Sequence, residues 1–281
     1  MDKRLTLEKR IEAELQSYDG IMCIYADDFH GNVISIGADE KFETASTIKT
    51  YILACLFGEV ENGDADLDEM LTYKKEHFVD GSGVICSLET GAVLRVRDAA
   101  ALMIIVSDNI ATNMLIEYLG IENINQSIQN LGFGETVLHN PLHFDRYRKL
   151  GTTTANDYGS LFTRLAKGKL VSEKADREMV EILKKQHYNS MITKDFPPVY
   201  MDSDNTDDIL IQVASKSGSM DACRNDGGII YTPYGPYVLV MLNKEFSDAM
   251  YYPGHPATVF GARVSRMLLD QFLALEGRFV L

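Results

Sequence analysis

The pattern of hydrophobic and polar positions changes period along the chain, first helical, then strand-like, then helical for a long stretch and finally strand-like again. Near the N-terminus, apolar residues three or four positions apart predict one amphipathic helix that ends at Asp19-Gly20: Leu7, Ile11, Leu15 and Tyr18. Two β-rich runs follow at 21–25 and 33–36, and the turn residues between them indicate a hairpin.

The middle of the chain is mostly helical. An apolar stretch that opens at Ser46 predicts a buried helix, and Gly63 after an acidic turn is a typical helix stop. Ser46 and Lys49 would then lie in the first turn of that helix. Further apolar or amphipathic segments predict helices near 98–106, 110–118, 124–131, 153–166 and 172–185.

The strand-like period returns after residue 208. The acidic segment 202–208 lacks the glycine and the closing glutamate of an EF-hand, so we expect a solvated loop there rather than a calcium site. Strands are predicted at 209–214, 228–231 and 237–242, followed by a helix with one apolar face: Val264, Met267, Leu268, Phe272 and Leu275.

Strands at both ends with helices between them predict an α/β fold of the α+β type. We expect an antiparallel sheet of about five strands drawn from both termini, flanked by helices and interrupted by an all-helical insertion. The predicted division is a sheet subdomain, 1–45 with 205–281, and a helical subdomain, 46–204. The active site would lie at the seam between them.

Composition narrows the possible partners. The 281 residues carry a formal net charge of -14, and a chain this acidic repels nucleic-acid backbones and anionic membranes. No apolar run approaches the ~20 residues of a membrane span, and the first residues lack a signal-peptide pattern. We therefore expect a cytoplasmic monomer as the sequence stands, or an exported one if this is a processed mature form.

The cysteines indicate neither a metal site nor a redox motif, so we expect no cofactor. They show no CxxC spacing, and most lie in apolar stretches typical of buried free thiols: Cys23, Cys55, Cys86 and Cys223.

The tetrapeptide Ser46-Thr47-Ile48-Lys49 combines two chemically useful groups, because a spacing of three places both side chains on one helix face. A serine hydroxyl needs a base to become a nucleophile, and a lysine is a base only when it is neutral. At the reference pKa of about 10.4 only ~0.04% of lysines are neutral at pH 7; a drop of ~3 units makes this roughly a quarter, at a cost of about 4 kcal/mol. Such a lysine needs a dry site and a second cation.

By itself this tetrapeptide is also explained by an N-cap serine followed by a solvated lysine. Two further polar groups have equally plain explanations when taken singly. Ser107-Asp108-Asn109 lies between two apolar helices, where it can cap a helix, and Lys216-Ser217-Gly218 follows a strand, where it can form a turn.

Together the three groups have the order and the wide spacing of one known set, S-x-x-K, S-D-N and K-T-G. The chain thus resembles the class A β-lactamase family from about residue 21 to residue 272. The resemblance includes the Asp-Gly-Ser-Gly-Val run at 80–84 and the Gly-Thr-Thr-Thr run at 151–154. It implies the β-lactamase/transpeptidase-like fold and a serine hydrolase that forms an acyl-enzyme.

The resemblance also implies roles for the residues that match its motifs. Ser46 would be the acylated nucleophile, and Lys49 its proton acceptor or relay. Ser107 would pass a proton toward the leaving nitrogen. Asn109 would hold the Lys49 amine and the substrate amide.

The remaining matched residues would bind the substrate. Lys216 and Ser217 would hold its carboxylate, and Lys216 would be the second cation that Lys49 requires. The backbone N–H groups of Ser46 and Ser219 would form the oxyanion hole. Arg224 lies one position before the place where the family often has an arginine that reaches the same carboxylate, and a surface arginine is an equal alternative.

The chain departs from the family pattern at residues 138–151. Family hydrolases carry an Ω-loop glutamate here that activates the deacylating water, whereas this segment is shorter and contains no glutamate. Its only carboxylate, Asp145, stands next to Arg146 and is expected to be an ion-paired surface residue. An imidazole titrates near neutral pH and can act as a base, but His139 and His143 are expected to be ordinary loop residues.

This departure leaves three functions open. The first is a β-lactamase-like hydrolase, acting on a β-lactam or peptide-like carboxylate substrate, in which deacylation limits turnover. The second is a D,D-peptidase-like amidase or esterase in which Lys49 serves both half-reactions. The third is a penicillin-binding sensor in which a long-lived complex is the signal.

Overall fold

The computed structural model describes residues 5–146, 149–188, 190–201 and 210–280. The predicted acidic loop at 202–208 and the first residue of the predicted strand at 209 lie outside these ranges.

The main sheet is antiparallel and joins the two ends of the described chain. Its order is β2-β1-β11-β10-β8, and the short strand β9 also pairs with β10. The N-terminal strand β1 runs beside the C-terminal strand β11, with Ile21 opposite Lys244. The predicted five-strand sheet is thus confirmed, with β9 as an added strand; the bounds are β1 Ile21–Asp27, β2 Val33–Ile36, β8 Gln212–Ser215, β9 Gly218–Met220, β10 Cys223–Thr232 and β11 Gly235–Lys244.

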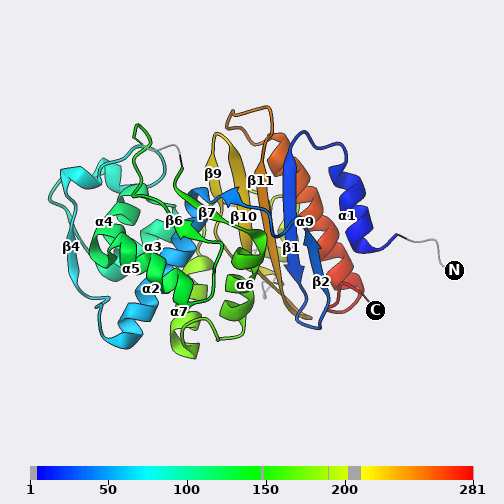
Figure 1. Ribbon diagram of the computed structural model, residues 1–281. Coiled ribbons are helices and arrows are strands. Elements are labelled where there is room, and N and C mark those ends of the chain that lie inside the picture. Colours follow the sequence, from blue (N-terminus) through cyan, green and yellow to red (C-terminus); the bar gives the residue numbers. More distant parts are fainter. Residues whose placement is uncertain (1–4, 147–148, 189, 202–209, 281) are drawn as a thin grey trace.

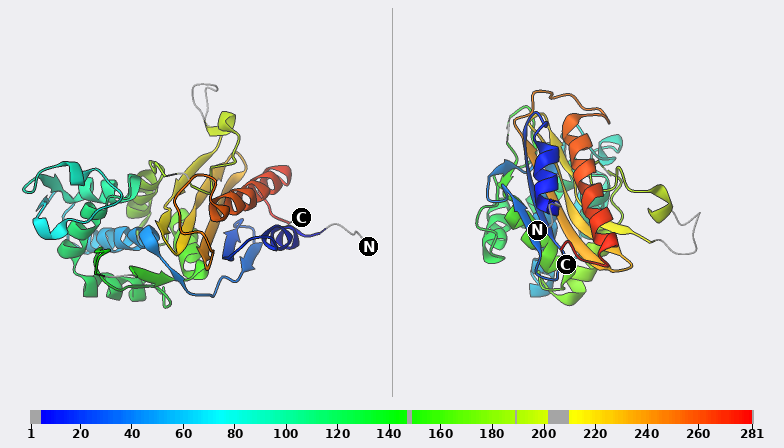
Figure 2. Two further views of the ribbon diagram at one scale, coloured as in Figure 1. Left: turned by 90° about the horizontal axis from the view of Figure 1, so that it is seen from above. Right: turned by 90° about the vertical axis from the view of Figure 1, so that its right-hand side faces the viewer.

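Strand β11 shows why the sheet is buried on both faces. Val238, Val240 and Leu242 pack into the core beneath the helical part of the molecule, whereas the alternating Leu239 and Met241 pack into a second core. Alternate side chains of a strand point to opposite faces, so a continuous apolar run indicates a sheet covered on both sides. The second core is closed by α1 (Leu7–Leu15) and α9 (Pro256–Ala274), which lie together on one side of the sheet (Figures 1 and 2).

The other face of the sheet carries the helical region (Figure 1). Its central helix, α2, buries every residue from Ile48 to Phe57 and ends at Gly63 in the left-handed conformation, as the sequence predicts. Thr154 and Ser172 are N-caps whose hydroxyls accept backbone N–H bonds, so α6 and α7 begin just after them. The helices are α2 Ile48–Asn62, α3 Val96–Ile105, α4 Asn109–Leu119, α5 Ile121–Asn130, α6 Ala155–Ala166, α7 Glu173–Leu183 and α8 Pro198–Met201, with 3₁₀ turns at Ala45–Thr47, Lys75–His77 and Ile85–Ser87.

Two small sheets were not predicted, because strands of two or three residues are too short to show a period. One has the order β3-β7-β6, and the other pairs β4 with β5. The first joins the entrance of the Ser46 turn to both ends of segment 138–151. The bounds are β3 Phe42–Glu43, β6 Val137–Leu138, β7 Gly151–Thr153, β4 Met70–Thr72 and β5 Val93–Arg95.

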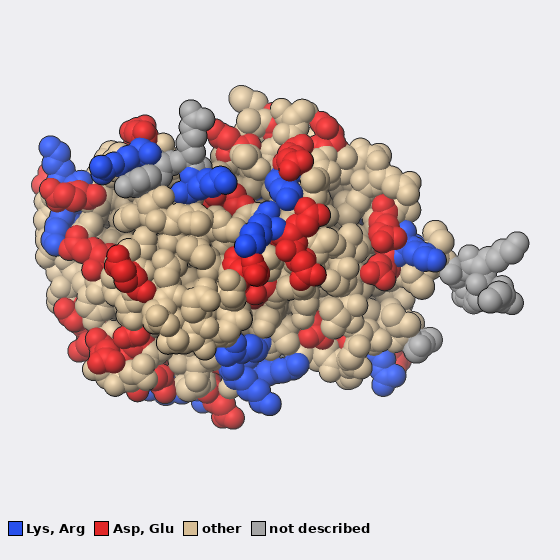
Figure 3. Space-filling view, viewed as in Figure 1, with Lys and Arg blue, Asp and Glu red and all other residues tan. Residues whose placement is uncertain are grey.

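On the face drawn in Figure 3, acidic and basic side chains lie interspersed. Among the described helices, none has the length and apolar character to cross a membrane. Cys23, Cys55 and Cys223 are buried free thiols as predicted, whereas Cys86 is exposed.

Candidate active site

Ser46 lies in a 3₁₀ turn, Ala45–Thr47, that leads directly into α2. The prediction that Ser46 lies in the first turn of the α-helix is therefore wrong by two residues, because α2 begins at Ile48, whereas Lys49 does lie in that first turn. Ala45 has a φ of 45°, a left-handed conformation that is unusual for a residue with a side chain. Such strain often occurs at functional sites.

Lys49 is fully buried and faces Ser107 and Asn109, as the family resemblance implies. Its Nζ lies 2.7 Å from the Ser107 carbonyl oxygen, 2.8 Å from Asn109 Oδ1 and 3.1 Å from Ser107 Oγ. A neutral amine has two N–H groups, which suffice for the carbonyl and amide oxygens, and a lone pair that remains for a proton. The three contacts therefore suit a lysine that exchanges a proton with a hydroxyl.

The surroundings of Lys49 favour its neutral form. Burial lowers the pKa of Lys49 well below its usual value, the nearby Lys216 lowers it further, and Asp108 opposes both effects. The dry site and the second cation required by the sequence argument are both present.

In the tripeptide Ser107-Asp108-Asn109, Asp108 has a structural role, whereas Ser107 and Asn109 contact Lys49. The Asp108 carboxylate caps α4 by accepting the Ala111 N–H, and it also accepts the N–H groups of Val84 and Ile85. Ser107 has a φ of 51°, which turns it toward Lys49 while its neighbour Asp108 caps the helix. Both explanations of this tripeptide therefore hold, each for different residues.

The Gly-rich run at 80–84 is explained by close contact with that tripeptide. A Cβ on Gly83 would lie 2.3 Å from Asp108 Oδ2, and one on Gly81 would lie 2.9 Å from Asn109 Nδ2. Asn109 Nδ2 donates to the Asp80 carbonyl, which orients the amide so that Oδ1 faces Lys49. Glycine is needed here because the loop backbone approaches both side chains.

The Lys216-Ser217-Gly218 segment lies against the nucleophile. A Cβ on Gly218 would lie 2.7 Å from the backbone nitrogens of Ser46 and Thr47, so only glycine allows β9 to pass so close to the turn. Ser219 follows on β9 and is exposed. The predicted oxyanion hole needs this closeness, because its two N–H groups come from Ser46 and Ser219.

Lys216 and Ser217 are both buried in the seam. Lys216 Nζ donates to the Ser217 carbonyl at 2.6 Å, and Ser217 Oγ donates to the Tyr188 carbonyl at 3.3 Å. Tyr158 OH donates to the Lys216 carbonyl at 2.9 Å and lies 3.2 Å from Thr50 Oγ1 of α2. Tyr158 thus connects the segment that carries Lys216 to the helix that carries Lys49.

Asp226 is a functional candidate that the sequence analysis missed. It is fully buried on β10 and accepts backbone N–H bonds from Met191, Ile192 and Gly227. Burial lowers the pKa of Lys216 to about 7, and the charge of Asp226 opposes that shift. Burial likewise raises the pKa of Asp226 to about 6. Asp226 lies inside a continuous strand and belongs to no motif, so only its position in the structure shows its importance.

Arg224 is 3% exposed, so the surface alternative is wrong. It stands opposite Ser219 in the pairing of β9 with β10. Its guanidinium lies over the Tyr251 ring at 4.1 Å and donates to backbone carbonyl groups: Met220, Cys223, Ala249 and Met250. A direct bond from Arg224 to a substrate carboxylate remains a prediction.

Hydrogen bonds hold described residues of segment 138–151 in place, whereas its two histidines and its aspartate are exposed. The Asn113 side chain bonds both the N–H and the carbonyl of the buried Leu142. His139 is engaged with Thr152 at 2.7 Å, and Asp145 and His143 are exposed.

One carboxylate reaches the end of this segment from outside it. Glu43 on β3 accepts the N–H groups of Leu150 and Gly151 through Oε1, at 3.0 and 3.1 Å. Its Oε2 is buried without a partner in the described part of the chain. Glu43 could not be identified from the sequence, because it belongs to a two-residue strand.

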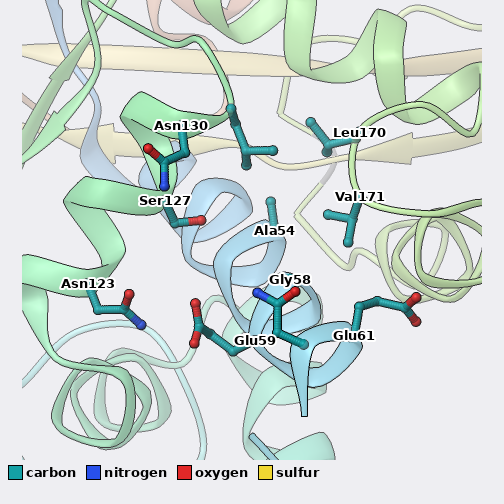
Figure 4. A pocket seen from close by; sticks show the side chains of 11 residues that line it. Ala54, Gly58, Glu59, Glu61, Asn123, Ser127, Asn130, Leu170 and Val171 are labelled. Carbon is teal, nitrogen blue, oxygen red and sulfur yellow. The ribbon is translucent and has the colours of Figure 1, made fainter. Parts of the chain in front are cut away.

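One hollow lies away from these residues. It has a volume of about 290 Å³ and is bounded by the C-terminal half of α2, by α5 and by residues 170–171 (Figure 4). A smaller hollow, of about 240 Å³, includes Ser219 and Arg224 in its lining. We place the candidate site at the seam because Lys49 meets Ser107 and Asn109 there, close to Lys216. Among the described residues no group of three His, Cys, Asp or Glu side chains is arranged to hold a metal ion.

Comparison with known proteins agrees with this arrangement. Residues 6–272 match the model of the β-lactamase enzyme family. The curated β-lactamase CARB-4 from Pseudomonas aeruginosa is 28% identical over 176 residues, which are 61% of this chain and 60% of that relative.

Solved structures match over more of the chain. A β-lactamase from Sphaerobacter thermophilus has a TM-score of 0.83 at 24% identity, covering 96% of this chain and 97% of that one. PBP-A has a TM-score of 0.83 at 26% identity, with 95% and 96% covered. A point mutant of PBP-A, solved as an acyl-enzyme complex with penicillin G, has a TM-score of 0.82 at 26% identity, with 95% and 96% covered.

Proposed function

Because the chain belongs to the β-lactamase enzyme family, we propose that it acylates Ser46 with a β-lactam or a related carboxylate-bearing amide and deacylates slowly. The observation that carries this proposal is the buried Lys49, which contacts both Ser107 and Asn109 and whose pKa is well below its usual value.

The acylation step uses this geometry directly. Ser46 Oγ attacks the substrate carbonyl carbon while its proton passes to the neutral Lys49 amine. The resulting oxyanion is stabilised by the backbone N–H groups of Ser46 and Ser219. The C–N bond then breaks as Ser107 donates its proton to the leaving nitrogen and is reprotonated by Lys49, so that an ester on Ser46 and a neutral Lys49 remain.

Deacylation requires a second nucleophile, a water molecule whose proton must go to a base. Segment 138–151 provides no glutamate, and its one aspartate is exposed. We therefore assign the slow step to this half-reaction, with Lys49 as the remaining base.

A penicillin-binding or D,D-peptidase-like role is the second candidate. It is favoured by the likeness to PBP-A, whose point mutant was solved as an acyl-enzyme complex with penicillin G. In this role the acyl-enzyme would persist, or the substrate would be a peptide-like amide or ester that is not a lactam.

Mass spectrometry of the intact protein during incubation with a penicillin tests the proposal. We expect an adduct of one penicillin mass that forms within seconds and decays over minutes to hours. Ser46→Ala should abolish it, and Ser35→Ala, an exposed serine on β2, is the matched control. A persistent adduct favours the sensor, and no adduct favours a non-lactam substrate. An adduct that survives Ser46→Ala removes Ser46 from the mechanism.

A further inference from the structure

The smaller hollow opens beside the expected reaction centre. Its volume of about 240 Å³ is below that of a typical site for a whole drug-sized ligand, so it suits one substituent of a larger molecule. Ser219 and Arg224 form part of its wall, and the rest comes from the segment after α7 and the region before and into α9: Ser190, Lys194, Tyr251, Tyr252, Pro253 and Thr258.

The lining of the hollow is basic, although the protein is strongly acidic. The whole chain has 41 acidic and 27 basic residues, yet this lining contains two cations, Lys194 and Arg224, and no carboxylate. Two carboxylates lie at the rim of the hollow, where Asp221 accepts the Tyr251 hydroxyl at 3.2 Å and Asp248 accepts the Tyr252 hydroxyl at 2.7 Å.

The charge of Arg224 interacts with that of the nearby Asp248, but without direct contact. In the parts of the chain that the structure describes, its guanidinium makes no ion pair. Four of its five N–H groups serve backbone carbonyls, which fix the plane of the group without cancelling its charge. Arg224 thus acts mainly through its electrostatic field, which is strong because the residue is buried.

Two side chains that line the hollow, Ser190 and Lys194, have hydrogen-bond donors to offer to a ligand. Ser190 Oγ is buried without a partner in the described chain. Lys194 is exposed, and one of its three N–H groups serves the Pro253 carbonyl at 2.7 Å, which leaves two for a ligand. A buried hydroxyl without a partner is unfavourable, so an incoming acceptor would correct it.

We propose that this hollow binds a second anionic group of the substrate, next to the carboxylate expected at Lys216 and Ser217. Lys194 Nζ and Ser190 Oγ donate to this group, and Arg224 supplies the field. The preferred substrates are therefore dianions, with two acidic groups on the side of the scissile amide that carries the carboxylate. This inference rests on the proposed function, because it assumes that the adjoining cleft binds a carboxylate-bearing amide.

Two chromogenic cephalosporins test this inference. Both have the ring carboxylate, and they differ only in one further carboxylate, which is carried by the aryl group of the substituent next to the ring carboxylate. We expect the second-order rate constant of acylation to be about fivefold to tenfold higher for the dianion, as charge-assisted bonds allow. The preference should fall as salt is raised, because Lys194 is exposed. Equal rates, or a faster monoanion, would overturn the proposal.

Substitutions show which side chains cause the preference for the dianion. Lys194→Met should bring the ratio of the two rate constants close to one, and Ser190→Ala should lower the ratio in part. Lys174→Met removes an exposed lysine of α7 instead and should leave the ratio intact. A ratio that survives Lys194→Met, or falls equally in Lys174→Met, would show general charge attraction and not a subsite.

A binding measurement separates failure of this inference from failure of the proposed function. Calorimetry with Ser46→Ala compares benzene-1,3-dicarboxylate with benzoate, neither of which can react. We expect tighter binding of the dicarboxylate, and loss of the difference when Lys194→Met is added. If neither cephalosporin acylates the wild type but this difference holds, the proposed function fails and the anion subsite stands. If both cephalosporins acylate the wild type but this difference is absent, the subsite fails alone.

Discussion

Two regions that border the site are built differently. They are the Lys49 cluster, which consists of Lys49, Ser107 and Asn109, and segment 138–151. Around Lys49, three short contacts converge on one buried amine, and a glycine-rich loop and a capped helix hold the partners in place. In segment 138–151, the side chain of Asn113 and the carboxylate of Glu43 hold the backbone, but Asp145 remains exposed.

The difference shows that a firmly positioned backbone and a positioned catalytic group are separate properties. Acyl transfer needs an activated hydroxyl and then an activated water. The Lys49 cluster supplies a buried amine whose pKa is lowered and which lies 3.1 Å from the Ser107 hydroxyl. Segment 138–151 has one carboxylate, Asp145, and that carboxylate is exposed. The proposal of fast acylation and slow deacylation follows from this contrast.

The largest effect should come from removing the base. Lys49→Ala should lower the acylation rate constant by about 10²–10⁴-fold, because it removes proton transfer, while non-covalent affinity changes little. Stopped-flow kinetics with a chromogenic cephalosporin separates the two quantities, and Lys174→Ala is the control. If Lys49→Ala reduces only the affinity, Lys49 binds substrate and does not activate Ser46.

The next effect concerns the second half-reaction. With a chromogenic cephalosporin we expect a burst of one product per enzyme followed by a slow steady rate. Asp145→Asn should leave the steady rate nearly unchanged, because this carboxylate is exposed. Rapid linear turnover without a burst would contradict the contrast between the two regions.

Glu43 sharpens this test. Its Oε2 is buried and unpartnered, so Glu43→Gln removes the charge while Oε1 is still able to accept the Leu150 and Gly151 N–H groups. We expect a steady rate within about threefold of the wild type if Glu43 only fixes the backbone, since each retained bond keeps its net ~1 kcal/mol. Collapse of the steady rate with an unchanged burst would identify Glu43 as the deacylating base.

Much of this architecture is predictable from the sequence, because the period-two runs at both ends and the long helical stretch between them are strong signals. The contacts of Lys49 follow from three motifs that are each ambiguous alone and specific together. The start of α2 was misplaced because a 3₁₀ turn and the first turn of an α-helix share residue preferences and differ only in hydrogen bonding.

What the sequence did not reveal depends on burial and on contacts between distant segments. Nothing local distinguishes Asp226 from a polar residue at the end of a strand; it matters because β10 brings its charge near Lys216. Glu43 is significant only because β3 pairs with the end of segment 138–151. Arg224 could not be assigned from spacing, since its burial depends on Tyr251 and on the carbonyl groups around it.

A modest effect is expected at Asp226, and it concerns pH. Lys216 must be protonated to hold a carboxylate, so acylation should weaken as the pH rises through the Lys216 pKa of about 7. The Asp226 charge raises that pKa, so Asp226→Asn should lower it and move the alkaline limb of the rate constant to lower pH. Because the pKa of Asp226 is about 6, the two proteins should differ little at pH 5.5.

At pH 7.5 a half-unit decrease in the Lys216 pKa would reduce its protonated fraction, and with it the acylation rate constant, by about threefold. The pH profile of the acylation rate constant for a carboxylate-bearing cephalosporin measures this shift. Asp195→Asn, an exposed residue, is the control and should leave the profile unchanged. A loss in Asp226→Asn that is equal at every pH would mean that Asp226 acts only by anchoring the N–H groups of Met191 and Ile192, and not through the charge state of Lys216.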